Sequence, residues 1–305
     1  MNTSIMLGNG LNRCIVDNIS WSNLLLDIAN EFHVTVNGEI SFPMQFEVLA
    51  NQILNSPQYQ GEDIYLCLKK NIITKLQSMV VPKELPHSEF AKLSNTLLTT
   101  NYDYLIEKSL DADFCIKDIT KCPKDNNNRY NLRNLTRVSG TNVYHVHGDI
   151  TSAKSICLGY EHYAGTLQHL RSSMTTIKQN NPNKTPEIVR TLTDDKYVID
   201  IWAEKFFTDD VHIVGLGLTQ SEIDIWWLLT YRASLYYSNR YNCRNLIANQ
   251  IVYHDVGIAE DVKMRAILKN MAVEYKFHMI HHNENKYYLQ EYMNIAKSIA
   301  ESTRK

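Results

Sequence analysis

Short apolar runs along this chain alternate with longer stretches in which apolar residues recur at helical spacing. The short runs predict strands at 5–7, 96–99, 114–119, 143–146, 155–158, 211–214, 251–253 and 274–280. The helical spacing predicts helices at 44–56, 62–79, 160–178, 197–208, 222–238, 259–272 and 286–303, after a first helix capped by Ser20 or Ser22. Strands that alternate with helices indicate an α/β fold, in which helices cover both faces of a mostly parallel sheet.

Two regions break this alternation. Residues 33–95 are almost entirely helical, and residues 160–208 are helical around a polar, proline-containing stretch at 178–184. A chain of 305 residues is long enough for one large α/β domain with sizeable insertions. We therefore expect a single unit over 1–305, in which the two helical insertions form a smaller lobe over the sheet.

Composition narrows the class of partner and the compartment. The net charge of -2 gives no basic surface for direct nucleic-acid binding. We expect no membrane span, because no run of about 18 apolar residues occurs, and the first residues lack the basic region of a secretory signal. Six scattered cysteines without a C-x-x-C pair fit reduced thiols in a cytoplasmic protein and oppose a four-cysteine zinc site.

Glycines are concentrated where predicted strands end. Five of the 11 glycines closely follow a predicted strand: Gly8, Gly10, Gly148, Gly215 and Gly217. Glycine permits tight turns there and lets the backbone approach a ligand closely. The loop at 8–12 could hold phosphates with its amides, although Arg13 replaces the third glycine of the dinucleotide motif and an ordinary tight turn is the alternative. A second glycine loop at 215–219 favours an elongated ligand that crosses the sheet.

Two polar side chains follow the predicted strand at 96–99. Asn101 and Asp103 supply an amide and a carboxylate two residues apart. Ligands of open α/β sheets bind at the carboxyl ends of strands. The pair is therefore well placed to hold a polar ligand.

A histidine pair marks the end of the strand predicted at 143–146. His145 and His147 are two residues apart, so we expect them to face the same side of the sheet. His147 directly precedes Gly148, which favours His147 as the residue in a cleft and as a general base. A hydrogen-bonded core histidine is the alternative. No carboxylate or cysteine at ligand spacing supports a metal pair, so no metal is expected.

The remaining candidates lie on predicted helices. Asp224 caps the helix at 222–238 or lines the site. The tyrosines of the last helix, such as Tyr287, Tyr288 and Tyr292, indicate helix packing or an oligomer face.

In this order, the motifs resemble the sirtuin-like superfamily, in particular its bacterial NAD-hydrolysing branch associated with anti-phage defence. The resemblance lies in Gly8-Asn9-Gly10-Leu11-Asn12, Ser20-Trp21, Thr99-Thr100-Asn101-Tyr102-Asp103, His147-Gly148 and Gly215-Leu216-Gly217, with Asp224 downstream. It implies a Rossmann-like domain that binds NAD+, with a smaller helical lobe and without a metal cofactor.

The resemblance also implies roles for particular residues. Asn101 and His147 would be the catalytic pair, and Asp103 would hold the nicotinamide side of NAD+. The complete expected NAD+-binding set is Gly8, Asn9, Gly10, Asn12, Thr100, Asp103, Gly215, Gly217, Thr219 and Asp224.

Two departures from the deacylases of this superfamily shift the expected reaction. The four-cysteine zinc ribbon is absent, and residues 13–19 do not contain the Pro-Asp-Phe-Arg segment. The sequence therefore predicts an NAD+ glycohydrolase (NADase) that releases nicotinamide and either ADP-ribose or its cyclic form. Its expected role is that of a toxic effector in abortive infection. An NAD-dependent deacylase or ADP-ribosyltransferase, or a non-catalytic module that senses NAD or ADP-ribose, are the alternatives.

Such a hydrolase must be held in check. We expect control through a homo-oligomer or through a separately encoded partner such as an ATPase.

Overall fold

The computed structural model describes residues 2–15, 20–59, 61, 63–82, 85–116, 129–179, 181 and 184–302. These residues form one seven-stranded sheet in the order β3-β4-β2-β1-β5-β6-β7. The strands are β1 (Asn2–Leu7), β2 (Thr96–Thr99), β3 (Leu135–Val138), β4 (Thr141–His145), β5 (Asp209–Val214), β6 (Ile251–Gly257) and β7 (Glu274–Met279). Neighbours are parallel except β3 and β4. This arrangement confirms the predicted Rossmann-like α/β fold.

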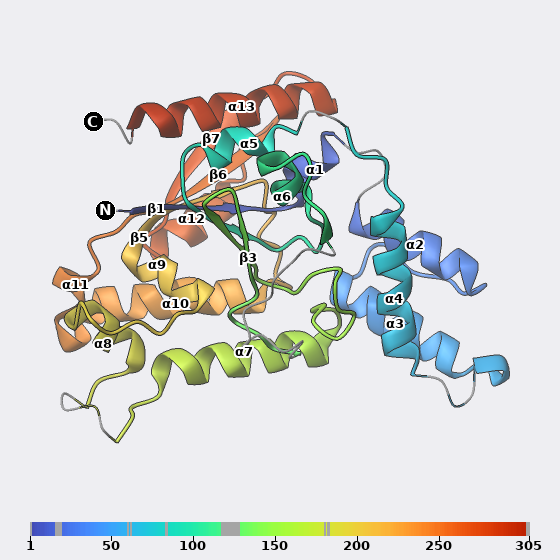
Figure 1. Cartoon of the computed structure of the whole chain (residues 1–305), viewed down its shortest axis with the longest axis horizontal. Helices are drawn as coiled ribbons and strands as arrows, with labels where there is room; N and C mark the ends of the chain where they lie inside the picture. Colours follow the sequence, from blue (N-terminus) through green and yellow to red (C-terminus); the bar gives the residue numbers. More distant parts are fainter. Residues whose placement is uncertain are drawn as a thin grey trace.

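Helices cover both faces of the sheet, and Figure 1 shows these two layers above and below the strands. Successive side chains of β1 point alternately into the cores under the two layers. Ile5 and Leu7 belong to the core beneath the upper layer, and Met6 belongs to the core of the lower layer. The upper layer contains α1 (Asn9–Arg13), α5 (His87–Ala91), α6 (Leu105–Leu110) and α13 (Asn285–Ser302). The lower layer contains α7 (Tyr160–Thr175), α8 (Glu187–Thr193), α9 (Lys205–Thr208), α10 (Ile223–Ser238), α11 (Cys243–Leu246) and α12 (Val262–Asn270).

A third core lies among helices at one end of the sheet, to the right in Figure 1. It is built by α2 (Trp21–Glu31), α3 (Phe42–Leu54) and α4 (Ile64–Gln77). Ser20 caps α2, because its hydroxyl accepts the N–H of Asn23 at 3.2 Å, as one of the two predicted caps would. Buried residues of α7 and α8 instead contribute to the core of the sheet. The grouping of both insertions into one lobe stays a prediction.

The structure corrects several local predictions. Residues 155–158 run as a loop, and residues 114–116 form no strand; the rest of that second predicted strand, 117–119, lies outside the described residues. In the region predicted as a helix at 197–208, only Trp202–Thr208 is helical, beginning with a 3₁₀ turn. The short antiparallel strand β3 was not predicted.

Strand β3 joins β4 through a two-residue turn at Ser139 and Gly140, both with positive φ (49° and 83°). Positive φ at both positions is the geometry that suits a tight hairpin. The Ser-Gly pair was thus a local signal for this hairpin. No helix in the described ranges is both long and apolar enough to cross a membrane.

Candidate functional site

The carboxyl ends of five parallel strands meet along one edge of the sheet. The register pairs Leu7 with both Thr99 and Val214, Thr99 with His145, and Val214 with His254. The chain moves from β1 through β2 to β4 on one side, and then returns to β5 on the other side of β1. A crevice forms where the strand order reverses in this way, and ligands bind there.

A cavity of about 460 Å³ opens at this edge, within the range of small-molecule sites. Its lining includes these residues of the expected site: Asn9, Gly10, Thr100, His147, Gly215, Gly217 and Thr219. Five others are not part of the lining: Gly8, Asn12, Asn101, Asp103 and Asp224. The contacts of these five show what each does in the fold.

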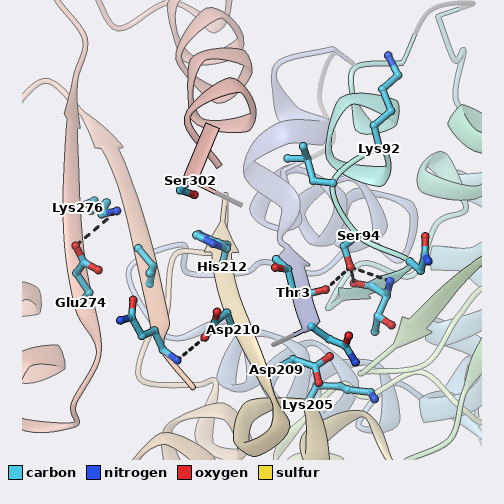
Figure 2. Close-up of a pocket in the computed structure, with 16 residues that line it drawn as sticks. Thr3, Lys92, Ser94, Lys205, Asp209, Asp210, His212, Glu274, Lys276 and Ser302 are labelled. Atoms are coloured by element: carbon cyan, nitrogen blue, oxygen red, sulfur yellow. Dashed lines mark hydrogen bonds and ion pairs between the residues drawn. The ribbon is translucent and has the colours of Figure 1, made fainter. Parts of the chain in front are cut away.

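A larger cavity of about 730 Å³ lies at the opposite edge, where the parallel strands begin. Figure 2 shows its charged side chains, which include Asp210, Glu274 and Lys276. Asp210 accepts the N–H of Gln250 at 2.7 Å, and Lys276 lies 3.5 Å from Glu274. We assign the site to the smaller cavity, because ligands of such sheets bind at the carboxyl ends and not at the amino ends.

The two glycine loops at the carboxyl edge contact each other through their backbones. The Gly8 N–H donates to Val214 O at 2.9 Å, and the Gly10 N–H donates to Gly215 O at 2.8 Å. A Cβ on Gly8 would lie 2.5 Å from Gly215 O, whereas a Cβ on Gly217 would meet only a methyl of Thr219 at 3.9 Å. Gly8 is therefore needed for contact between the loops. Gly217 lines the cavity with no such constraint, which suits close approach by a ligand.

Asp103 links the first glycine loop to the end of β2. Its two carboxylate oxygens accept the side-chain amide of Asn12 at 2.8 Å and the N–H of Leu105 at 3.0 Å. The carbonyl oxygen of Asn12 accepts from His87 Nε2 at 2.8 Å, and burial keeps His87 neutral by lowering its pKa to about 3. In this structure Asn12 and Asp103 hold two loops together. Their predicted contacts with NAD+ stay predictions.

Asn101 is fixed by its backbone and keeps a side-chain acceptor open. Its N–H donates to Thr99 Oγ1 at 3.1 Å, and its backbone carbonyl contacts His145 Nδ1 at 3.1 Å. The side-chain Oδ1 is buried and has no hydrogen-bond partner among the described residues. A buried polar atom without a partner is costly, and a hydrogen bond from a ligand or a water would remove that cost at Asn101.

His147 lies between two carboxylates at the lining of the cavity. Its Nε2 is 2.9 Å from Asp224 Oδ2, and its Nδ1 is 3.8 Å from Glu222 Oε2. Tyr163 of α7 contacts the ring edge to face at 5.3 Å between centroids. Burial lowers the pKa of His147, but the charges of Asp224 and Glu222 outweigh burial and raise it to about 9. The ring is then protonated at neutral pH, which differs from the general base expected from the sequence.

Glu222 was not among the residues expected at the site, although it lines the cavity. Its Oε2 is buried and has no hydrogen-bond partner among the described residues. Burial raises the pKa of this carboxyl to about 7, and the positive ring of His147 opposes that shift. The sequence could have indicated Glu222 as a site residue, because it lies three residues after Thr219, in the turn that leads from the second glycine loop into α10.

Three side chains could in principle hold a metal ion. Ligand atoms of His147, Glu222 and Asp224 lie within 4.8 Å of one another, the one such group in the described part of the chain. The facing atoms of His147 and Asp224 are already hydrogen-bonded at 2.9 Å. We therefore interpret the group as an acid–base cluster.

His145 has a different environment from His147. Its Nε2 bonds Glu107 of α6 at 2.8 Å in the upper layer, whereas His147 bonds Asp224 of α10 in the lower layer. The prediction that both face one side is wrong, because β4 ends at His145 and its alternation does not continue to His147. His145 is the hydrogen-bonded core histidine, and His147 is the one at the cavity.

A row of three histidines crosses the other half of the sheet. His212 Nδ1 contacts His254 Nε2 at 3.0 Å, and His254 Nδ1 contacts His278 Nε2 at 3.0 Å. The row ends on α13, where His278 Nδ1 lies 3.2 Å from Glu291. Burial lowers the pKa of each histidine, to about 4 for His212 and about 2 for His254, so the row is neutral. His254 lines the candidate site and His212 lines the opposite cavity.

Aromatic side chains complete the half of the cavity near β6. Tyr288 and Tyr292 of α13 and Tyr253 of β6 line it. The sequence had indicated packing or an oligomer face for the first two. Their role at the cavity depends on how α13 lies over the sheet, which no local pattern specifies.

Comparison with known protein families finds a match over part of the chain. A family model described as the SIR2-like domain matches residues 95–225, and no curated protein matches the chain. The matched segment runs from just before β2 into the start of α10, so it contains Asn101, His147, Glu222 and Asp224. The match supports the sirtuin-like superfamily, whose domains use NAD+, and fits an NAD-dependent enzymatic function in general.

Proposed function

We propose that this protein hydrolyses NAD+ to nicotinamide and ADP-ribose at the carboxyl-edge cavity, as the toxic effector of a bacterial anti-phage system. The observation that carries this proposal is the pair formed by Asn101 and His147. They follow the register partners Thr99 and His145 by two residues each, so they leave neighbouring strand ends together. One offers a buried, unbonded acceptor and the other a protonated ring held between carboxylates.

The charges at the site suit cleavage of a glycosidic bond. Breaking the bond between nicotinamide and ribose builds positive charge on the ribose in an oxocarbenium-like transition state. The cluster of His147, Asp224 and Glu222 sets two carboxylates against one positive ring, so it is net negative when both carboxyls are ionised. A negative, preorganised group stabilises that developing charge. Asn101 orients the ribose hydroxyls or the attacking water.

The cysteines of the chain favour water over an acylated peptide as the second substrate. The described cysteines, Cys14, Cys67, Cys115, Cys157 and Cys243, are all free, and Cys122 lies outside the described residues. With the zinc ribbon of the deacylases absent from the sequence, hydrolysis remains the better reading.

Nicotinamide release from NAD+ by the purified protein tests the proposal. Asn101→Ala and His147→Ala should each lower the rate by roughly 10²–10⁴-fold. Circular dichroism spectra and melting temperatures close to those of the wild type would show that both variants are folded. Wild-type rates in both variants would refute the assignment.

The same assay separates the alternatives. A deacylase would release nicotinamide only with an acylated peptide, and a sensing module would bind NAD+ without releasing it. Chromatography of the products separates ADP-ribose from its cyclic form.

Control of such an activity is part of the proposal. Free NAD+ in the cytoplasm would be consumed by an unregulated hydrolase. We therefore propose a resting state that is controlled by assembly into a homo-oligomer activated by infection, or by a separately encoded partner such as an ATPase. Size-exclusion chromatography with and without products of neighbouring genes tests this. Full activity of an isolated monomer would oppose it.

A further inference from the structure

Glu222 is the one carboxylate of the cluster that lines the cavity and keeps an unbonded buried oxygen. We propose that Glu222 accepts the proton of the attacking water, and that His147 and Asp224 are the residues that position it. This role rests on the proposed hydrolysis of NAD+. It moves the general base from the histidine, where the sequence suggested it, to a carboxylate beside that histidine.

The backbone fixes Glu222 while leaving its side chain available. Its N–H donates to Thr219 O at 3.0 Å, and its carbonyl accepts the N–H of Trp226 at 2.9 Å. It precedes α10 without capping it through its side chain. Its Oε2 lies 3.8 Å from His147 Nδ1, close enough for attraction but beyond a direct hydrogen bond. That oxygen can therefore accept a proton from a substrate water.

The other two members of the cluster are less suited to that task. Asp224 is fully buried, and its two oxygens contact His147 and the N–H of Ile225. The pKa of His147 is raised to about 9, so both ring nitrogens carry a proton at neutral pH and neither offers a lone pair to water. Glu222 alone combines an open acceptor with a place on the cavity wall.

The reaction balances without another reactant. The bond between ribose C1′ and the nicotinamide nitrogen breaks, and its electron pair leaves with nicotinamide, which becomes neutral. The water oxygen forms a bond to C1′, and the water proton passes to Glu222 Oε2, which later releases it to solvent. NAD+ and water thus give ADP-ribose, nicotinamide and a proton.

The groups around Glu222 give the reaction a defined pH dependence. His147 faces it from beyond β4 and Asp224 from its own helix, while Tyr163 of α7 contacts the ring of His147. Burial raises the pKa of Glu222 to about 7, so turnover should rise as the pH passes through about 7 and the carboxyl ionises. This acidic limb should disappear when residue 222 cannot ionise.

The test compares wild-type protein with Glu222→Gln, which keeps the shape and removes the base. Glu301→Gln, at an exposed position near the end of α13, is the matched control. Glu222→Gln should release nicotinamide roughly 10²–10⁴-fold more slowly, with KM for NAD+ little changed and melting unaltered. Sodium azide should raise the rate of nicotinamide release by Glu222→Gln at least tenfold, because azide attacks C1′ without losing a proton.

Each result has a defined meaning. Wild-type turnover in Glu222→Gln, or a loss that azide does not restore, overturns the role of Glu222. If Asn101→Ala is inactive at the same time, the proposed hydrolysis still stands. A wild-type protein that binds NAD+ and releases no nicotinamide, both alone and with the products of neighbouring genes, overturns both proposals.

Discussion

The two edges of the sheet differ in how deeply their charged pairs are buried. At the amino edge, Lys276 and Glu274 pair while about half exposed, at 44% and 52%. At the carboxyl edge, His147 and Asp224 pair while almost fully buried, at 2% and 0%, and oxygens of Asn101 and Glu222 have no hydrogen-bond partner among the described residues. The amino-edge cavity is the larger, and the carboxyl-edge cavity is lined by Glu222, which has a buried oxygen without a hydrogen-bond partner among the described residues.

This difference shows that the size of a cavity does not tell whether its lining offers polar atoms that can bind a ligand. Exposed charges are solvated and screened, so an exposed cavity lined by them costs the fold little. Buried polar atoms without partners cost free energy and persist where a ligand completes them. Three substitutions test the comparison, from the largest expected effect to the smallest.

Asp224→Asn tests whether the carboxyl-edge charges are coupled. Removing one partner of a buried pair should lower the free energy of unfolding by about 3 kcal/mol at neutral pH. The pKa of His147 is raised from 6.5 to about 9, so its stabilising contribution is complete below pH 6.5 and is lost as the pH rises through 9. Chemical denaturation of wild type and variant from pH 6 to pH 9.5 measures this.

The wild type should lose stability across that range, and Asp224→Asn should lose less. His145, which is bonded to Glu107, titrates in the same range in both proteins and therefore cancels. Equal slopes for the two proteins would show that His147 is not held by Asp224.

Gly8→Ala tests how closely the two glycine loops pack. The added Cβ would lie 2.5 Å from Gly215 O, a backbone atom that cannot move freely. We expect a loss of about 1–3 kcal/mol in the free energy of unfolding, together with weaker NAD+ binding. Gly217→Ala is the matched control, since its Cβ meets only Thr219 at 3.9 Å. It should keep wild-type stability and weaken binding alone; equal stability of the two variants would contradict the packing argument.

Lys276→Ala tests the amino edge. The exposed pair with Glu274 should contribute no more than about 0.5 kcal/mol, and nicotinamide release should match the wild type. A clear loss of turnover without loss of stability would place function at the larger cavity and reverse the comparison.

The sequence predicted the layers of the fold better than the details of the site. Apolar runs located every parallel strand. Burial on both faces leaves such a run in β1, β2 and β5, whereas no residue of the edge strand β7 is buried. The apolar runs also produced a false strand at 155–158, where Ile156 and Leu158 are buried beneath helices α2–α4 instead of in the sheet. Strand β3 was missed, since its residues are few and the signal lies in the turn that follows.

At the site, residues next to strand ends were predictable and residues brought in by tertiary packing were not. His147 was recognised at the cavity from its place before Gly148. Its charge state was not, because that depends on carboxylates 75 and 77 residues further along the chain. The same holds for Tyr288 and Tyr292, which reach the cavity only through the position of α13.

A single carboxylate sets the donor-to-acceptor direction of the hydrogen bonds along the row of three histidines. Glu291 can only accept when ionised, so His278 must donate from Nδ1 and accept at Nε2. A neutral imidazole has one donor and one acceptor, so His254 must then donate from Nδ1, and His212 must do the same. One side chain on α13 thereby selects the tautomer of a histidine three links away. It leaves the Nε2 of His212, a residue that lines the amino-edge cavity, as an acceptor.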